Sequence, residues 1–571
     1  MRGEPLSGGI AIAQALIIRK EEDVVYSSIS QSDKPKELIR LSKGIAAAAA
    51  ELEKLIEKVR EEMGEDKAEI FEGHLEILTS EDFETEIAEI INEKNVCAEE
   101  AVKLYSDQNA AEMEELDDDY FKERGQDFQD IGQQVINTIR GTSANYSLLE
   151  REVIIVAYEL TPSQTARLDI KKVAGFILQK GGKNSHAAII ARSLEVPAII
   201  IKEPDPFKII KDGDTVSING DNGELEINPS HAKIRSLEKS IEKKLKEKTE
   251  LEKLIDLPAV TTDGIRIGMF ANVGGSFDIE SAARYNVDGI GLFRSEFLFM
   301  ESAGLPTAAR QASVYRKAIE SMPGKDVIIR LLDTGADKPL PYWKLPVEEN
   351  PFLGVRGIRL LLQKEEILRT QIQALLQASA SGPVGIMIPM VNSLSPIERV
   401  RAIIEEEKKA VLWDKRLDLK LGIMVETPAA VQLIEEMLDI VDFISIGTND
   451  LTQYLLAADR GNPQMGSYYD EFHPAVIRSI AHIIKKARKK EKLNGICGEF
   501  AGNKLALPFF IGLKVGELSM TPSSVPVIKN MIRQIDSRDA ENLVNEILRI
   551  PTSEGIKSRL SQFLTERDLI K

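Results

Sequence analysis

The carboxyl-terminal half of the sequence repeats one pattern, in which a short apolar run precedes a stretch with helical periodicity. The apolar runs occupy residues 265–271, 289–293, 327–332, 384–388, 421–425, 443–446, 495–497 and 516–519. Short continuous apolar runs are typical of strands buried in a parallel sheet between helices. About eight strand–helix units in roughly 300 residues predict a (β/α)₈ barrel of the TIM type over residues 261–571.

Charged residues at the ends of these strands are the first candidates for chemistry, because barrel active sites lie at the carboxyl ends of the strands. Arg294 follows one predicted strand, Arg330 lies in the next, and Arg356 lies in the segment 350–357. Guanidinium groups offer paired donors that match phosphate and carboxylate oxygens. Three arginines at one mouth therefore predict a site for a small, multiply charged anion.

Two carboxylates and a cysteine occupy similar positions. Glu426 and Asp450 each end a strand segment, and such a pair can hold Mg²⁺ or Mn²⁺ while substrate and water supply the other oxygens. A single charged residue at a strand end usually makes a structural salt bridge, but five of them in one domain favour a site. Cys497 ends a strand between glycines, where it is either a small buried hydrophobe or a proton donor.

The segment 181–188, GGKNSHAA, places a histidine where a glycine turn enters a helix. Ser185 is a plausible N-cap, and residues 187–194 have a helical pattern. A helix amino terminus binds phosphate through its free N–H groups and its dipole. His186 is therefore a candidate phosphoryl acceptor, although a capped turn with an incidental histidine explains this segment equally well.

The amino-terminal half has a different organisation. Short apolar runs predict an α/β domain made of residues 1–20 and 149–229, with the first strand of the chain joining its sheet. The acidic residues 21–148 form a predicted helical insert. Residues 230–260, rich in Lys and Glu, predict a long linker helix braced by charge pairs. The whole chain is expected to be a multidomain α/β protein.

The composition of the chain argues against several classes of protein and indicates a cellular compartment. The net charge of −18 argues against a nucleic-acid binder and against docking on an anionic membrane. No apolar run is long enough for a signal peptide or a membrane span. Only two cysteines occur, Cys97 and Cys497, which fits a reducing compartment. We expect a cytoplasmic protein.

Five long motifs occur in one order along the chain: GGKNSHAAIIARSLEVPAI, GLFRSEFLFM, NPFLGVRGIR, GIMVETPAA and SIGTNDLTQYLLAADR. In these motifs the chain resembles enzyme I of the bacterial phosphoenolpyruvate:sugar phosphotransferase system over essentially its full length. The resemblance implies a swivelling α/β phosphohistidine domain, an inserted helical bundle that binds the carrier protein HPr, a linker helix and a barrel that binds phosphoenolpyruvate.

The resemblance also implies roles for single residues. His186 would be phosphorylated, with Thr165 donating a hydrogen bond to it, and Cys497 would protonate the enol carbon as pyruvate forms. Glu426 and Asp450 would ligate Mg²⁺. The residues that would bind phosphoenolpyruvate are Arg294, Arg330, Arg356, Lys338, Asn449 and Arg460. The family usually has threonine at position 184, where the asparagine of this chain can still donate and accept hydrogen bonds.

The implied reaction moves the phosphoryl group of phosphoenolpyruvate to His186 and then to a histidine of HPr, releasing pyruvate, as the first step of sugar uptake. A homodimer formed through the barrel is also implied. Two alternatives stay open: a paralogue that feeds a regulatory phosphorelay, and a phosphoenolpyruvate synthase or pyruvate,phosphate dikinase. The second needs a nucleotide-binding domain, but residues 1–150 contain no glycine-rich phosphate loop.

Overall fold

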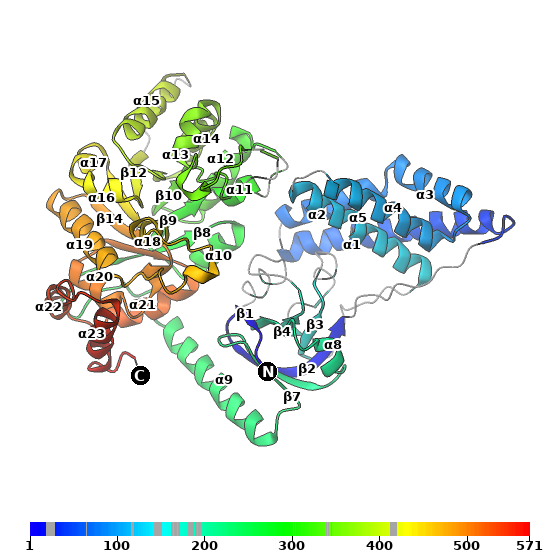
Figure 1. Cartoon of the computed structure of the whole chain (residues 1–571), viewed down its shortest axis with the longest axis horizontal. Coiled ribbons are helices and arrows are strands. Elements are labelled where there is room, and N and C mark those ends of the chain that lie inside the picture. Colours follow the sequence, from blue (N-terminus) through cyan, green and yellow to red (C-terminus); the bar gives the residue numbers. More distant parts are fainter. Residues whose placement is uncertain are drawn as a thin grey trace. The chain divides into compact units, whose positions relative to one another are not determined.

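A computed structural model describes the chain except residues 19–28, 64, 116–118, 142–150, 161–163, 165–167, 170–171, 181–187, 189–190, 192–195, 301, 303, 339, 341, 344, 411–418 and 571. The chain divides into two compact units, Met1–Lys246 and Glu247–Lys571 (Figure 1). The multidomain α/β class predicted from the sequence is confirmed. None of the helices in the described parts of the chain combines the length and apolar character needed to cross a bilayer.

The first unit contains a seven-stranded sheet with the strand order β1-β5-β4-β3-β2-β6-β7. The strands are β1 (Glu4–Ser7), β2 (Ile10–Ile18), β3 (Val153–Ala157), β4 (Val173–Leu178), β5 (Ala198–Ile200), β6 (Thr215–Asn219) and β7 (Glu224–Ile227). Strands β2 to β5 pair in parallel, whereas β1, β6 and β7 pair antiparallel. As predicted, the first long strand of the chain joins this sheet, beside β3.

The described residues between β2 and β3 form the helices α1 (Lys34–Met63), α2 (Glu65–Leu78), α3 (Glu81–Lys94), α4 (Ala98–Glu115) and α5 (Asp119–Arg140). Leu52, Phe83 and Ile131 are among the residues of their shared apolar core, which is separate from the two cores of the sheet. Ser80 caps α3 by accepting a hydrogen bond from the Phe83 amide, and Asn95 ends this helix in the left-handed conformation. The helical character of the insert is thus observed, while the exact domain boundaries stay predictions.

Among the described residues, helices α8 (Pro206–Ile209) and α9 (His231–Glu252) follow β5 and β7, and α9 leads out of the first unit. Helix α9 is the predicted charged helix. Its exposed side chains include the pair Lys246–Glu242, with Nζ 2.7 Å from Oε1 at a spacing of four residues.

The second unit is built on a closed barrel with the strand order β8-β9-β10-β11-β12-β13-β14-β15, and all neighbouring strands are parallel. The strands are β8 (Gly268–Val273), β9 (Gly289–Arg294), β10 (Asp326–Arg330), β11 (Val384–Ile388), β12 (Leu419–Val425), β13 (Phe443–Gly447), β14 (Leu493–Cys497) and β15 (Glu517–Met520). Each overlaps one predicted apolar run, so the barrel prediction is confirmed.

Helices alternate with these strands and cover the barrel, as Figure 1 shows for its green-to-red half. They are α10 (Ser276–Arg284), α11 (Glu296–Met300), α12 (Ala308–Glu320), α13 (Ile358–Gln363), α14 (Glu365–Ala378), α15 (Ser395–Ala410), α16 (Pro428–Gln432), α17 (Ile434–Ile440), α18 (Thr448–Leu456), α19 (Pro474–Lys489), α20 (Leu507–Leu513), α21 (Val525–Ile532), α22 (Ser537–Ile547) and α23 (Ser553–Thr565). One large apolar core joins strands and helices.

The inside of the barrel is filled by its own cluster of side chains, which includes Met387, Met424, Phe443 and Cys497. The Phe443 ring fits because Gly422 faces it: a Cβ at that position would lie 2.4 Å from the ring. The interior is therefore packed, which leaves the two ends of the barrel as places for polar chemistry.

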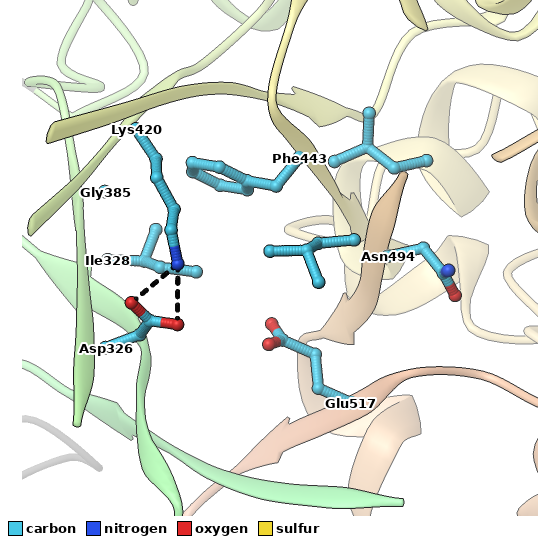
Figure 2. Close-up of a pocket in the computed structure, with 9 residues that line it drawn as sticks. Asp326, Ile328, Gly385, Lys420, Phe443, Asn494 and Glu517 are labelled. Atoms are coloured by element: carbon cyan, nitrogen blue, oxygen red, sulfur yellow. Dashed lines mark hydrogen bonds and ion pairs between the residues drawn. The ribbon is translucent and has the colours of Figure 1, made fainter. Parts of the chain in front are cut away.

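At the amino ends of the strands the barrel holds a small cavity of about 20 Å³ lined in part by Asp326, Lys420 and Glu517 (Figure 2). Lys420 Nζ lies 2.9 and 3.0 Å from the two carboxylate oxygens of Asp326. Gly495 makes room for Glu517, since a Cβ there would lie 2.4 Å from Glu517 Cγ. Burial, with a smaller contribution from Asp326, raises the pKa of Glu517 from 4.5 to about 8.

This raised pKa predicts a pH dependence of stability. The folded state holds the Glu517 proton more tightly than the unfolded chain, so the stabilisation is complete below the ordinary pKa and is lost as pH rises through about 8. The variant Glu517→Gln has no proton to lose. We expect the thermal unfolding midpoint of Glu517→Gln, measured relative to that of the parent, to increase between about pH 6 and pH 9. The exposed control Glu280→Gln should show no such gain, and parallel curves for Glu517→Gln and the parent would refute the prediction.

Candidate active site

The carboxyl ends of the barrel strands bring the predicted residues of the second unit to one mouth. Arg294, Arg330 and Cys497 are the last residues of β9, β10 and β14. Glu426 directly follows β12, and Asp450 lies in the first turn of α18, directly after β13. Because all strands run in parallel around a closed barrel, these positions share one end.

Asp333, which the sequence did not single out, lies within 4 Å of three cationic side chains at this mouth. It is fully buried, and its Oδ2 lies 2.8 Å from Arg356 Nη2, 3.3 Å from Arg330 Nη1 and 3.5 Å from Lys338 Nζ. Burial alone would raise the pKa of Asp333, but Arg330 and Arg356 outweigh it and hold the pKa well below its usual range. Asp333 is therefore a permanent negative charge that fixes three positive side chains.

Glu296 supports the same arrangement from the first turn of α11. Its Oε1 accepts hydrogen bonds from Arg330 Nη2 at 2.9 Å and from the Asp333 backbone amide at 2.8 Å. Burial alone would lower the pKa of Arg330, but Glu296 and Asp333 raise it above its usual value. The guanidinium of Arg330 is thus held charged and oriented. Glu296 stands two residues after Arg294 and Asp333 three after Arg330, so proximity to the arginines was the available signal.

Arg294 has a different environment from Arg330 and Arg356. Among the described residues no carboxylate oxygen lies within 4.0 Å of its guanidinium. Burial and the nearby charge of Arg330 lower the pKa of Arg294. A guanidinium that is half-buried without a close counter-charge is costly. An anion that entered the mouth would relieve this cost, so Arg294 is the side chain best prepared to bind one.

Glu426 and Asp450 present carboxylate oxygens that the described residues leave without hydrogen bonds. Glu426 is fully buried; its Oε1 accepts from the Met390 amide at 2.6 Å, whereas Oε2 has no partner. Gly447 leaves space beside this Oε2, since a Cβ there would lie 2.9 Å from it. Asp450 Oδ1 is also buried without a hydrogen bond, although Arg460 Nη2 lies 3.3 Å away.

The electrostatics of the two carboxylates fit a bound cation. Burial, together with the charges of Asp450 and Asp333, raises the pKa of Glu426 to about 8. A divalent cation would supply the positive charge that this buried carboxyl lacks. The residues present therefore fit Mg²⁺ or Mn²⁺.

Cys497 is buried at the end of β14, and its Sγ donates to the Ile446 carbonyl oxygen at 3.5 Å. Burial raises the pKa of its thiol to about 11, so the side chain keeps its proton at neutral pH. Gly498 follows with φ +114°, and a Cβ there would lie 2.5 Å from Thr448 Oγ1. This glycine lets the chain turn closely past α18 and fixes the position of the cysteine.

The remaining predicted barrel residues also lie around this mouth. Arg460, beyond the end of α18, pairs with Asp450, and its backbone amide donates to Gln453 Oε1 at 3.0 Å. Asn449 Oδ1 accepts from the Glu499 amide at 3.4 Å, on the loop that follows Cys497. Lys338 is joined to Asp333, as described. The structure thus brings together all the barrel residues that the sequence singled out.

His186 and Thr165, together with Asn184, lie outside the described residues. Of the helix predicted over 187–194, Ala188 and Ala191 are described, and both are buried. The phosphoryl-acceptor role of His186 therefore stays a prediction from the sequence.

The chain is similar to known proteins over nearly its full length. Three family models match it: PEP-utilising enzyme, N-terminal, over residues 2–124; the mobile domain over 149–223; and the PEP-binding domain over 248–537. A phosphoenolpyruvate-protein phosphotransferase of Haemophilus influenzae is 40% identical over 569 residues, which cover 99% of each chain. The chain belongs to this family. Another family member, from Bacillus subtilis, is 39% identical over 97% of this chain and 98% of its own length.

A solved structure described as an NMR solution structure of Enzyme I is also similar. It is 35% identical, covers 42% of this chain and 98% of its own, and has a TM-score of 0.39. The resemblance to this family seen in the sequence motifs is therefore confirmed by the full-length matches.

Proposed function

We propose that this protein is a phosphoenolpyruvate-protein phosphotransferase that moves a phosphoryl group from phosphoenolpyruvate to its own His186 and then to a histidine of the carrier HPr. One observation carries the proposal. Among the described residues, the mouth holds an arginine with no carboxylate oxygen within 4.0 Å, beside two carboxylates that each keep one oxygen without a hydrogen bond, on a chain matched end to end by transferases of this name. That mouth suits a substrate that is both a phosphate and a carboxylate.

The substrate would meet a set of cations that the protein has already oriented. The positive charges of Arg294, Arg330 and Lys338 lie near the ends of β9 and β10. The neutral amide of Asn449 lies at the start of α18, and the positive charge of Arg460 lies beyond its end. Phosphoryl transfer depends on position and charge neutralisation more than on covalent help. Carboxylates such as Asp333 hold the cations in place before the substrate arrives, so little reorganisation is needed during the reaction.

Glu426 and Asp450 would hold Mg²⁺, with Mn²⁺ as a substitute. The described residues contain no group of three or more His, Cys, Asp or Glu side chains arranged as metal ligands. In our proposal the other ligands are therefore oxygens of the substrate and water. When bound, the ion would neutralise negative charge that develops on the phosphoryl and enolate oxygens.

The bond changes balance as follows. A neutral imidazole nitrogen of His186 forms a bond to phosphorus, and the bond from phosphorus to the enol oxygen breaks. The enolate takes the Cys497 proton at its terminal carbon and becomes pyruvate, and solvent later reprotonates the thiolate.

His186 must reach both this mouth and HPr in turn, which requires movement of its domain. HPr would dock on the helical insert, the barrel would form a homodimer, and the protein would work in the cytoplasm.

Cys497→Ala should slow pyruvate formation by about 10²–10⁴-fold, the usual contribution of a positioned general acid. A coupled assay of pyruvate release in the presence of HPr measures this rate. Cys97→Ala, which changes the chain's other cysteine in the helical insert, is the matched control and should react like the parent. A Cys497→Ala rate within about threefold of the parent would remove the proton-donor role.

The proposal as a whole is tested by pyruvate release with and without HPr. Without HPr we expect a burst of about one pyruvate per chain, because each histidine accepts one phosphoryl group and then has nowhere to pass it. Addition of HPr should convert the burst to steady turnover. Steady turnover without any protein acceptor would point to hydrolysis instead, and the absence of a burst would contradict phosphorylation of this protein.

A further inference from the structure

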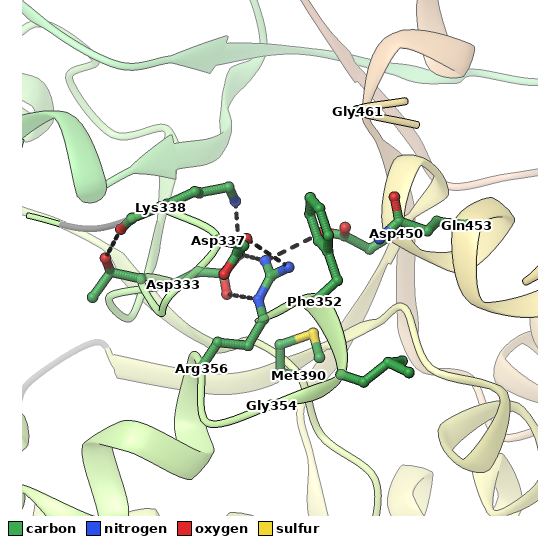
Figure 3. Close-up of polar contacts among 12 residues, drawn as sticks. Asp333, Asp337, Lys338, Phe352, Gly354, Arg356, Met390, Asp450, Gln453 and Gly461 are labelled. Atoms are coloured by element: carbon green, nitrogen blue, oxygen red, sulfur yellow. Dashed lines mark hydrogen bonds and ion pairs between the residues drawn. The ribbon is translucent and has the colours of Figure 1, made fainter. Parts of the chain in front are cut away.

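Arg356 differs from the other arginines of the mouth because carboxylate oxygens lie next to all three nitrogens of its guanidinium. The side chain is 0% exposed. Its Nε and Nη2 donate to the two oxygens of Asp333 at 3.3 and 2.8 Å, and its Nη1 lies 3.0 Å from Asp337 Oδ2 (Figure 3). Nη1 makes no hydrogen bond among the described residues, but the guanidinium is fully buried, so a small anion would have to displace a neighbouring carboxylate to reach it.

The same guanidinium also reaches the far side of the site. Its Nη2 lies 3.8 Å from Asp450 Oδ2, and the Phe352 ring lies 5.8 Å from its central carbon. Asp333 and Asp337 follow β10, whereas Asp450 begins α18 after β13. Arg356 therefore bridges the loop that organises the substrate cations and one of the two proposed metal ligands.

The backbone around Arg356 is fixed against the same loop. A Cβ on Gly335 would lie 2.4 Å from Arg356 Cβ, so the two segments pass in close contact. Gly357 adopts φ +55° and its amide donates to the Thr334 carbonyl oxygen at 3.0 Å. These contacts hold the backbone at Arg356 in place and so limit the movement of its guanidinium. They favour a structural role for this side chain over one in which it moves to meet a ligand.

We propose that Arg356 is a positioning residue that orients Asp450 for the metal ion and Asp333 for the substrate cations, and that it does not contact phosphoenolpyruvate. This revises the sequence-based expectation that Arg356 binds substrate directly. It rests on the proposed metal role of Glu426 and Asp450. The planar fork of arginine can serve several carboxylates at once, whereas the point charge of lysine cannot.

The test is the affinity of the full-length protein for Mn²⁺ without substrate, titrated by electron paramagnetic resonance. Arg356→Lys keeps the positive charge near Asp450 and removes only the fork, so we expect the dissociation constant to rise about tenfold, as for other residues that orient metal ligands. Arg294→Lys is the matched control: the same change at the same mouth, on a side chain that has no carboxylate oxygen within 4.0 Å among the described residues. Its Mn²⁺ affinity should stay within about twofold of the parent.

Two results would contradict the positioning role: an Arg356→Lys affinity within about twofold of the parent, or an equal loss in Arg294→Lys, which would indicate a general disturbance of the mouth. If circular dichroism shows that Arg356→Lys does not fold, Asp337→Asn provides the test. It removes only the charge of the carboxylate that lies 3.0 Å from Nη1, and we expect the Mn²⁺ dissociation constant to rise about threefold; no rise overturns the proposal.

Glu426→Gln separates this inference from the function on which it rests. If Glu426→Gln binds Mn²⁺ as well as the parent does, or if the parent binds none, the proposed metal site is wrong and the inference falls with it. If Glu426→Gln loses Mn²⁺ while Arg356→Lys does not, only the role of Arg356 is wrong.

Discussion

Protein with His186 replaced by alanine should take up no phosphate from phosphoenolpyruvate and should release no burst of pyruvate. We expect a complete loss because the variant lacks the nitrogen that, in the proposed reaction, forms the bond to phosphorus. Incubation with labelled phosphoenolpyruvate and Mg²⁺, followed by separation of the protein from the substrate, measures the uptake.

The control for this variant is His231→Ala, which removes an exposed histidine at the start of α9. It should take up phosphate like the parent. Binding of phosphoenolpyruvate to His186→Ala should persist, because the proposed binding residues all lie in the barrel. Labelled His186→Ala protein would show that another residue is the acceptor.

Glu426→Gln should reduce turnover by about 10³-fold, which corresponds to about 4 kcal/mol of charge stabilisation lost with the metal ion. The amide has the same shape as the carboxyl, so packing should be preserved. In the absence of metal the variant should be at least as stable as the parent, because a buried carboxyl with a raised pKa becomes a neutral amide. Mn²⁺ should raise the thermal unfolding midpoint of the parent but not that of Glu426→Gln.

Glu517→Gln is the matched control for this variant: a half-buried glutamate of the same barrel, at the opposite end of the strands, changed in the same way. It should keep the turnover of the parent and its response to Mn²⁺. Normal turnover by Glu426→Gln, or an equal loss in Glu517→Gln, would contradict the assignment of the metal ligand.

The barrel could be predicted from the sequence because helices cover its strands, whose middle residues are therefore apolar, while charged residues stand mainly at the strand ends. Strands β1, β6 and β7 escaped prediction for the opposite reason. They are short, they pair antiparallel at or near the edges of their sheet, and β7 alternates Glu with apolar residues. In the pattern of the sequence such segments look like turns and loops.

The positive residues of the site could also be predicted, but the carboxylates that hold them could not. The sequence reasoning looked for groups that bind an anion, and it passed over Glu296, Asp333 and Asp337 for that reason. A buried guanidinium needs a counter-charge, and only the fold shows which carboxylates provide one. The same pairing shows that Arg356 is enclosed while Arg294 is not, a distinction absent from the motifs.

The most direct test of the central claim is to locate the phosphate on the protein. The purified chain is incubated with phosphoenolpyruvate and Mg²⁺, digested under basic conditions, and mapped by mass spectrometry for acid-labile, base-stable phosphate. We expect a single phosphohistidine at His186, formed without ATP. Phosphate on any other residue, or at His186 only when ATP is supplied, would contradict the claim.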